Sequence, residues 1–340
     1  MTKRPTIHDV ARHAGVSKSL VAVVFNSDTG VSEKRRAQVM KAAEELGYTP
    51  NAWARTLRSS SGGFVGIIVA DFHNPLFTDI AEAARQLLAS QGIFSFVSTA
   101  SLVDGPDGKI VDPEPIHHLL DLKPSSLFIV GGLPEHGAFT NLPSGMPIVV
   151  ALASATNIPT AVTVRTDETV AMHMLCSHLH DLGHHVVAYV GPEGRPVTEA
   201  RRDAFVEQAT IEGFEFSVVS SGRDIDERGG LEAAQVALDQ SPRPTAIVCF
   251  NDIVAFGTQS AILRASEGGA PDVAVTGFDN TYIAQLDRID LTTVSQDVAA
   301  IARESCAVLT DPDTFAAVSG TEIFVAPELI VRSSTTAVPV

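Results

Sequence analysis

From residue 64 onward, short apolar runs of the kind that form buried strands alternate with helical patterns of apolar residues. Continuous apolar runs with helices between them are typical of parallel sheets that are covered on both faces. The number of runs suits two such sheets better than one. The runs span residues 64–70, 93–98, 127–130, 147–152, 161–164, 186–190, 215–219, 246–250 and 273–277, and the clearest helical patterns span 77–90, 168–182, 198–211, 229–238 and 253–266.

The first 62 residues have a different sequence pattern. The apolar spacing predicts three short helices within residues 5–47, with Thr6, Ser17 and Ser32 as their N-caps. Residues 48–62 contain one short helical run, at 52–58, and end in Ser and Gly, which predicts a linker. The polar stretch 103–115, rich in Asp, Gly and Pro, is interpreted as a surface loop.

Charge divides the chain in the same place. Residues 1–60 hold ten Lys and Arg against five Asp and Glu, a net charge of +5 that leaves −21 for the rest of a chain whose total is −16. A small basic head on a large acidic body is expected of a nucleic-acid reader with a separate sensor, although a charge of +5 alone also arises by chance.

Several protein classes are excluded by composition. The sequence has no apolar run of about 18 residues, so no membrane span is expected, and no apolar segment follows the charged N-terminus as in a signal peptide. Three widely spaced cysteines, Cys176, Cys249 and Cys306, fit neither a disulfide framework nor a zinc cluster. We therefore expect a cytoplasmic protein.

The residue pattern of the segment 10–24 is typical of a helix-turn-helix. Ala11 is small where two helices would cross, and Gly15 permits a tight turn four residues later. Val16, Val21 and Val24 then supply apolar contacts that would hold a second helix, whose exposed positions enter the major groove of DNA. This short pattern is weak by itself, because many helical hairpins satisfy it.

A longer set of stretches runs in order through the whole chain and is far more specific. They are Thr6-Ile-His-Asp-Val-Ala-Arg-His-Ala-Gly-Val-Ser17, Phe25-Asn26, Val31-Ser32, Ala42-Ala-Glu-Glu-Leu-Gly-Tyr48-Thr-Pro-Asn51, Ala54-Arg55-x-Leu57, Val65-Gly-Ile-Ile-Val69, Asn74-Pro75-x-Phe77, Leu182-Gly-His184, Arg201-x-x-x-Phe205, Pro244-Thr-Ala-Ile-x-Cys249-x-Asn251-Asp252, Gly277-Phe-Asp-Asn280 and Leu291-Thr-Thr-Val294. Together they resemble the lactose-repressor (LacI/GalR) family. The resemblance implies a DNA-binding headpiece, a hinge helix and a core like the periplasmic sugar-binding proteins.

The resemblance assigns DNA contacts within the headpiece. Ser17 matches a helix-capping phosphate contact, and Asn26 matches a backbone contact after the helix. Lys18 and Ser19 fall where the family reads base edges, and Lys18 can donate to guanine O6 and N7 or only touch phosphate. Further DNA-contacting positions are Thr6, Ser32 and Tyr48.

The recognition helix also departs from the family. Leu20, Ala22 and Val23 stand where the family commonly has Thr, Ser and a base-reading Arg or His. Three polar contacts are therefore absent, which leaves the operator sequence open.

The hinge follows the family more closely. The resemblance implies that Asn51 caps a short helix that forms on DNA, and that Leu57 wedges into the minor groove together with its symmetry mate. Ala54 is small enough for close approach, and Arg55 and Arg58 supply charge to phosphates. Interdomain packing is the alternative role of Leu57.

A sensor pocket is expected where parallel strands end, in the cleft between two lobes. The resemblance implies that Arg201, Asn251 and Asp279 hold an effector, with Phe77 lining the pocket, although each polar residue could instead be a cap or an interlobe bridge. The remaining candidates are Asp71, Phe72, Asn74 and Asp252. A sugar is the leading candidate for the effector. Many sugar-responsive members of the family carry an acidic residue soon after the strand that matches 147–150, and this sequence has none there. A nucleobase or another small metabolite therefore stays open as the effector.

No cofactor, metal site or enzymatic activity is expected. His180 and His184 have the i, i+4 spacing of helical zinc ligands, but Gly183 interrupts the helix between them. We find no phosphate-binding loop, nucleophile elbow or paired-carboxylate pattern.

The sequence thus predicts a small all-α helix-turn-helix headpiece joined to an α/β two-lobed periplasmic-binding-protein-like core. The expected domains are a headpiece at 1–49, a hinge at 50–62 and a core at 63–340, with an N-lobe at about 63–160 and 294–322 and a C-lobe at about 161–293 and 323–340. The expected function is a homodimeric regulator, most simply a repressor, of a pseudo-palindromic DNA operator under control of a small molecule. The alternatives are a transport solute-binding protein and a sugar-processing enzyme.

Overall fold

A computed structural model describes residues 5–26, 31–48, 63–100, 102–105, 108–133, 139, 142–143, 145–155, 158–222, 225–266 and 273–335. The chain divides into two compact units, Met1–Gly63 and Phe64–Val340. The hinge candidates Asn51, Ala54, Arg55, Leu57 and Arg58 lie outside the described residues.

In the described residues of the first unit, the chain forms three helices, α1 (Ile7–His13), α2 (Lys18–Asn26) and α3 (Glu33–Leu46), as the sequence predicts. Their apolar faces meet in a small core that includes Val10, Val21 and Val39. Gly15, between α1 and α2, has a φ of +61°, a left-handed conformation that costs glycine little.

Helix capping in this unit agrees only in part with the prediction. The Asp9 carboxylate accepts hydrogen bonds from the Thr6 backbone N–H (2.9 Å) and hydroxyl (2.7 Å), and the Ser17 hydroxyl accepts from the Leu20 N–H (3.2 Å). Ser32 occupies the N-cap position of α3, but its side chain makes no capping hydrogen bond. Its carbonyl instead receives the Arg35 and Arg36 N–H groups.

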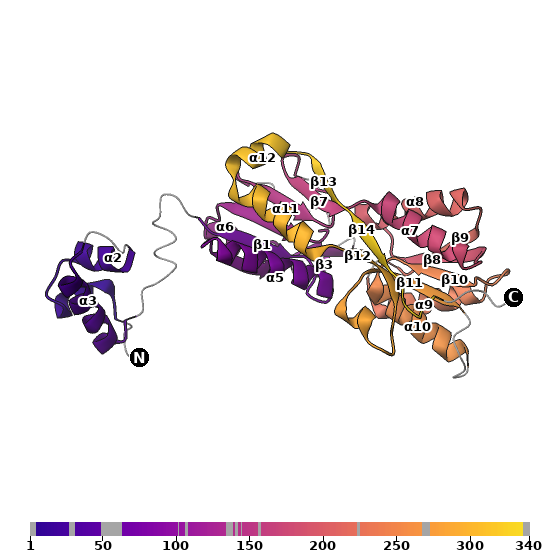
Figure 1. Ribbon diagram of the computed structural model, residues 1–340, viewed down its shortest axis with the longest axis horizontal. Helices are drawn as coiled ribbons and strands as arrows, with labels where there is room; N and C mark the ends of the chain where they lie inside the picture. The colour runs from indigo at the N-terminus through magenta and orange to yellow at the C-terminus, as the bar shows by residue number, and fades with distance from the viewer. Residues whose placement is uncertain are drawn as a thin grey trace. The chain divides into compact units, whose positions relative to one another are not determined.

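The second unit is built on two six-stranded sheets (Figure 1). We call the first sheet and its helices the N-lobe; its strand order is β13 (Glu322–Val325), β7 (Val162–Thr166), β6 (Ile148–Ala151), β5 (Ser126–Val130), β1 (Val65–Val69), β2 (Ser95–Thr99). All of these strands are parallel, and Val65 of β1 lies opposite Ser95 and Ser126. The N-lobe helices are α5 (Pro75–Ser90), α6 (Pro113–Asp121), α11 (Val298–Thr310) and α12 (Pro312–Val318).

The second sheet and its helices form the C-lobe. Its strand order is β14 (Pro327–Ile330), β12 (Thr292–Gln296), β11 (Ala274–Asp279), β10 (Ala246–Cys249), β8 (Val186–Gly191), β9 (Glu215–Ser220), and only β14 runs antiparallel to its neighbour. The C-lobe helices are α7 (Glu168–Asp181), α8 (Pro196–Ile211), α9 (Glu227–Leu238) and α10 (Asp252–Ala265), with a 3₁₀ turn η2 (Tyr282–Gln285). Each lobe has its own apolar core.

The chain crosses between the lobes three times, and the expected lobe boundaries differ from these crossings. Strand β7 pairs with β6 in the N-lobe, so the first crossing follows Thr166 rather than residue 160. Strand β12 pairs with β11 in the C-lobe, and β13 pairs with β7 in the N-lobe. The chain therefore returns to the N-lobe after Gln296 and leaves it again after Val325, as the gold segment of Figure 1 shows.

The prediction of a surface loop at 103–115 was wrong. Leu102–Gly105 and Gly108–Val111 pair as an antiparallel hairpin, β3 and β4, and α6 follows directly. Gly105 and Gly108 form the last pair of the hairpin, and the Gly, Pro and Asp residues on which the prediction rested are turn formers as well as loop formers. Among the helices that the structure describes, none is both long and apolar enough to cross a membrane.

Candidate functional site

A cavity of about 400 Å³ lies between the two lobes, beside the crossing segments. The N-lobe contributes Leu76 and Asp79 from α5, and the C-lobe contributes the ends of β11 and β12. These strand ends carry Asp279 and Gln296. Polar groups therefore converge at the carboxyl ends of parallel strands, and of the expected effector residues Asp279 lines this cavity.

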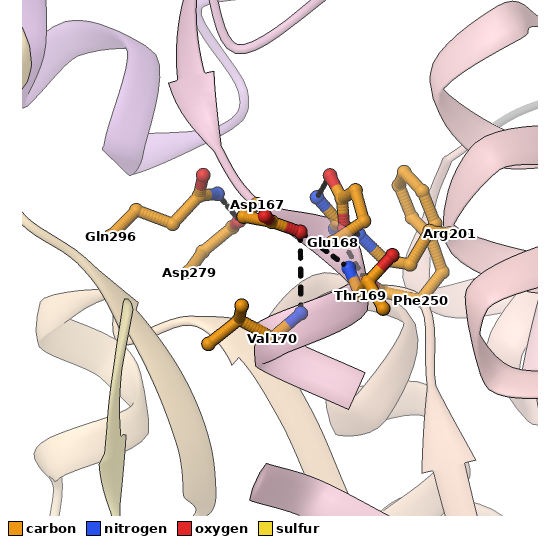
Figure 2. A network of polar contacts seen from close by, with 8 residues as sticks. All are labelled: Asp167, Glu168, Thr169, Val170, Arg201, Phe250, Asp279 and Gln296. Atoms are coloured by element: carbon orange, nitrogen blue, oxygen red, sulfur yellow. Dashed lines mark hydrogen bonds and ion pairs between the residues drawn. The ribbon is translucent and has the colours of Figure 1, made fainter. Parts of the chain in front are cut away.

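Asp279 joins the lobes. Its Oδ2 accepts a hydrogen bond from Asn74 Nδ2 of the N-lobe at 3.0 Å, and its Oδ1 accepts from Gln296 Nε2 at 2.8 Å. Figure 2 shows Asp279 and Gln296 facing each other. Burial raises the pKa of Asp279, while Arg201 and the two amide donors act to lower it. With a φ of +114°, Asp279 also holds a backbone conformation that favours glycine, which is typical of functional positions.

Arg201 is the centre of a buried network in the C-lobe (Figure 2). Its Nε and Nη2 donate to the two carboxylate oxygens of Glu168 at 2.7 and 2.9 Å, and its Nη1 donates to the Phe250 carbonyl at 2.8 Å. The rings of Phe278 and Phe250 flank the guanidinium, with centroids 3.6 and 4.6 Å from Cζ.

The charge of Arg201 is therefore compensated inside the protein. The side chain is only 3% exposed. Burial acts to lower the Arg201 pKa, but the attraction and hydrogen bonds of Glu168 outweigh it and raise that pKa. A bidentate carboxylate partner and two aromatic faces leave the guanidinium little capacity to bind an anionic ligand.

Three polar residues near the lobe junction cap helices. Asn74 Oδ1 accepts from the Leu76 N–H at 2.9 Å, and Asn251 Oδ1 accepts from the Val254 N–H at 3.1 Å. At the first crossing, Asp167 Oδ1 accepts from the Thr169 and Val170 N–H groups (Figure 2). Asn74 is thus both a cap and a cross-lobe donor, whereas the only side-chain hydrogen bond described for Asn251 is its cap.

Asp252 lies beneath the site and has no accessible surface. Its Oδ2 accepts from the Thr281 N–H (2.7 Å) and hydroxyl (2.9 Å), and its Oδ1 accepts from the Thr293 hydroxyl (2.6 Å). Burial raises the pKa of Asp252 to about 7, with a further contribution from Asp279. These contacts hold the turn that follows Asp279.

The loop after β1 lies at the junction of the two lobes. Asp71 and Phe72 are exposed, and His73 Nε2 lies 3.4 Å from Glu227 Oε2 of the C-lobe. Phe77 is half-buried and packs against Gly131. The structure therefore brings Asn74 and Asp279 together, while Asp71 and Phe72 face solvent.

The sequence did not lead us to several residues that make contacts in this region. Glu168 directly follows the crossing residue Asp167, and an acid there reads equally well as an ordinary first-turn residue of a helix. Gln296 ends a strand that the apolar pattern did not reveal. The contact residues that were not predicted are Glu168, Gln296, Phe250, Phe278, His73 and Glu227.

In the headpiece, the candidate DNA contacts lie on several elements. Lys18 and Ser19 are exposed in the first turn of α2, and Thr6 and Ser32 are exposed at helix starts. Asn26 is the last residue of α2. Tyr48 is half-buried, with its ring 5.7 Å from that of Phe25, so it also packs within the headpiece.

The histidines of α7 and of the turn that follows it make ordinary contacts. His180 lies 4.0 Å from Glu212, and His184 is within hydrogen-bond distance of the Thr245 hydroxyl. Across the described part of the chain, no group of three or more His, Cys, Asp or Glu side chains is arranged to hold a metal ion.

Two families of known proteins match the chain. Residues 6–51 match the family described as bacterial regulatory proteins, lacI family. Residues 176–335 match a periplasmic binding protein-like domain.

Whole-length relatives agree with this division. The chain is 27% identical to the HTH-type transcriptional regulator DegA of Bacillus subtilis over 98% of both chains. It is also 27% identical to the HTH-type transcriptional repressor CytR of Escherichia coli, over 98% of this chain and 97% of CytR. A crystal structure of the lac repressor dimer bound to operator and the anti-inducer ONPF superimposes with a TM-score of 0.81 at 25% identity, over 98% of this chain and 100% of the other.

The buried ion pair yields a stability prediction. Glu168→Gln keeps the size of the side chain but leaves the Arg201 charge uncompensated, which costs about 3–5 kcal/mol for a buried pair. We expect the midpoint of urea unfolding to fall sharply. Glu232→Gln is the matched control, because Glu232 pairs with Arg228 at 2.8 Å on the exposed face of α9, and exposed pairs contribute only about 0–1 kcal/mol. Equal midpoints for the two variants would contradict the role assigned to the pair.

Proposed function

Because the chain belongs to the LacI family of bacterial regulatory proteins, which are DNA-binding transcription regulators rather than enzymes, we propose that it is a homodimeric repressor controlled by an uncharged small molecule. The headpiece binds operator DNA, and the cleft between the lobes binds the effector. Since its target is chromosomal DNA, the protein acts in the cytoplasm.

The headpiece carries the main support for DNA binding. Its three helices form a helix-turn-helix with Lys18 and Ser19 exposed in the first turn of the second helix. The first 60 residues have a net charge of +5 in a chain of −16, so attraction to phosphates is concentrated there. The lac repressor, which the whole chain resembles in structure, is bound to operator in its crystal structure.

The hinge is proposed to order on DNA. Residues 52–58 are too few to persist as an isolated helix in water, so their folding is coupled to binding. We assign Asn51 as the cap, Arg55 and Arg58 as phosphate contacts, and Leu57 as a minor-groove wedge beside Ala54.

A dimer places two headpieces on two half-sites. Among the large apolar side chains that the C-lobe exposes are Leu263 of α10 and Tyr282 and Leu286 around η2. Gln259 of α10 donates to the Ile289 carbonyl at 3.0 Å, which holds these two segments together. Exposed apolar side chains gathered in this way are typical of protein interfaces, and we propose that this surface contributes to the homodimer.

The cleft favours an effector rich in hydroxyl groups. The amides of Asn74 and Gln296 donate to the carboxylate of Asp279, and hydroxyl groups, which both donate and accept, can replace these neutral-donor contacts. Arg201, by contrast, is already paired with Glu168, so no uncompensated cation is offered by that side chain. We therefore propose a neutral sugar or related polyol, held by Asn74, Gln296, Asp279 and Phe77, with Asn251, Asp71, Phe72 and Asp252 around them.

Effector binding would couple to DNA binding through the angle between the lobes. Each lobe has its own core, and only three crossing segments and cross-lobe contacts such as Asn74–Asp279 connect them. A ligand that prefers one lobe angle shifts operator affinity by about 1–3 kcal/mol in typical allosteric proteins.

The DNA-binding proposal is tested by selecting duplexes from a random pool with the purified protein at two salt concentrations. We expect a pseudo-palindrome whose binding weakens steeply with salt and is largely lost in Leu57→Ala. Ser60→Ala, in the same linker, serves as the control and should bind normally. If no duplex is enriched, or if Leu57→Ala binds as well as the control, the headpiece or hinge assignment respectively is wrong.

The effector proposal is tested by thermal unfolding in the presence of neutral sugars and of their phosphate esters. A neutral sugar at about 100 times its Kd should add about 2.7 kcal/mol of stability. Gln296→Ala should lose this stabilisation, because it removes an amide from the cleft. Stabilisation by the phosphate esters alone would contradict an uncharged effector.

A further inference from the structure

Two buried carboxylates lie close together at the floor of the cleft. Asp252 begins α10 and has no accessible surface, and Asp279 ends β11 and is only 5% exposed. Thr281, two residues after Asp279, donates to Asp252 through both its N–H and its hydroxyl. Gly277, two residues before Asp279, approaches Asp252 so closely that a larger side chain there would collide with the carboxylate. The turn that carries one acid is therefore built around the other.

The charges in this region do not balance. Arg201 is already paired with Glu168 through two hydrogen bonds, so three buried carboxylates share one guanidinium (Figure 2). Burial raises the pKa of both Asp252 and Asp279, and that of Asp252 reaches about 7 because the charge of Asp279 adds to the effect. Arg201 opposes the shift at Asp279. A proton shared by the two acids therefore resides on Asp252.

The other groups around Asp252 are neutral. The Thr281 and Thr293 hydroxyls and the Thr281 backbone N–H are the donors that the structure describes for it. Cys249, at the end of β10, interacts with Asp252, but burial raises the pKa of its thiol to about 12 and keeps it uncharged. Among these neighbours, Asp279 is therefore the group whose charge Asp252 responds to.

We propose that Asp252 is a proton-linked positioning residue, so that the neutral effector binds tightly only when Asp252 is protonated and its binding takes up a proton from solvent. The inference rests on the proposed function, in which Asp279 accepts hydrogen bonds in the cleft. A ligand that fills the cleft excludes water, which strengthens the repulsion between two buried carboxylates. A proton on Asp252 removes that repulsion and leaves Asp279 charged as an acceptor.

The hydrogen bonds of Asp252 can persist in both charge states. Its Oδ2 accepts both bonds from Thr281, so the proton belongs on Oδ1, which lies 2.6 Å from the Thr293 hydroxyl. A hydroxyl accepts as well as donates, so that contact reverses its direction rather than breaking. Protonation therefore changes the charge beneath Asp279 while the turn keeps its shape.

The test uses the neutral sugar that most stabilises the protein in thermal unfolding. Such a sugar does not titrate, so any pH dependence of its affinity belongs to the protein. The affinity should fall about tenfold from about pH 6 to about pH 8, because the protonated fraction of Asp252 falls by that factor. Calorimetry in two buffers of different ionisation enthalpy should show uptake of about half a proton near pH 7.

Asp252→Asn separates the charge from a merely structural role. The amide keeps the size of the side chain, accepts from Thr281 and donates to Thr293, so it imitates the protonated acid. This variant should bind the sugar at about pH 8 as tightly as the unaltered protein does at about pH 6, with no proton uptake. Asp226→Asn, at the N-cap of α9, is the control and should keep the tenfold dependence. Circular dichroism checks that both variants fold.

The outcomes separate this inference from the proposed function. If a neutral sugar binds the unaltered protein equally well at both pH values and without proton uptake, the inference fails while the proposed effector class stands. It also fails if Asp252→Asn binds more weakly but with an unchanged pH dependence, since Asp252 is then only structural. If no neutral sugar stabilises the protein, the proposed effector is wrong and the inference falls with it. Should Asp252→Asn not fold, proton uptake by the unaltered protein decides the matter.

Discussion

The ion pair between Arg201 and Glu168 is the interaction on which the cleft depends. It joins the first turn of α7, directly after a lobe crossing, to helix α8. The guanidinium also binds the carbonyl of Phe250 and lies against the ring of Phe278, which precedes Asp279 in β11. Two buried charges are tolerated only with such geometry, because removing ions from water is costly. The pair therefore holds Asp279 in place for its contact with the N-lobe.

Polar groups at the lobe junction stabilise helix starts, and the Asn74 side chain also makes a cross-lobe contact. Asn74, Asp167, Asn251 and Asp297 each follow a strand and cap the next helix. Each carboxyl strand end is thereby attached to a rigid helix, so the groups that face the cleft are preorganised. Three crossing segments connect the two lobes. This arrangement suits lobes that move as rigid bodies around a ligand.

The sequence predicted the alternation of buried strands and helices because β1, β5 and β6 are continuous apolar runs. It did not reveal β12, whose residues Thr-Thr-Val-Ser-Gln carry a single apolar side chain. Thr292 and Thr293 are nevertheless buried, because their hydroxyls bond to Thr335 and Asp252. Polar strands that find distant partners leave no hydrophobic pattern in the sequence.

The site was predictable in the same uneven way. Asn74 and Asp279 follow apolar runs and lie in stretches that resemble the family, so they were named as candidates, and the structure brings them together. Glu168 was not predicted as a site residue, because its partner Arg201 is 33 residues away and only the packing of α7 against α8 reveals the pair. Arg201, expected to contact the ligand, is neutralised by Glu168 within its own lobe, and its contact with an effector stays a prediction.

The most direct test of the account is the operator affinity of a variant altered only at the lobe junction. Asn74→Asp keeps the oxygen that caps α5 but replaces the amide donor to Asp279 with a like charge. Asp112→Asn, at the N-cap of α6 in the same lobe, is the matched control. If the cleft is coupled to the headpiece, Asn74→Asp should change operator affinity by about fivefold or more while the control does not. Equal affinities would contradict the proposed coupling between the lobes and DNA binding.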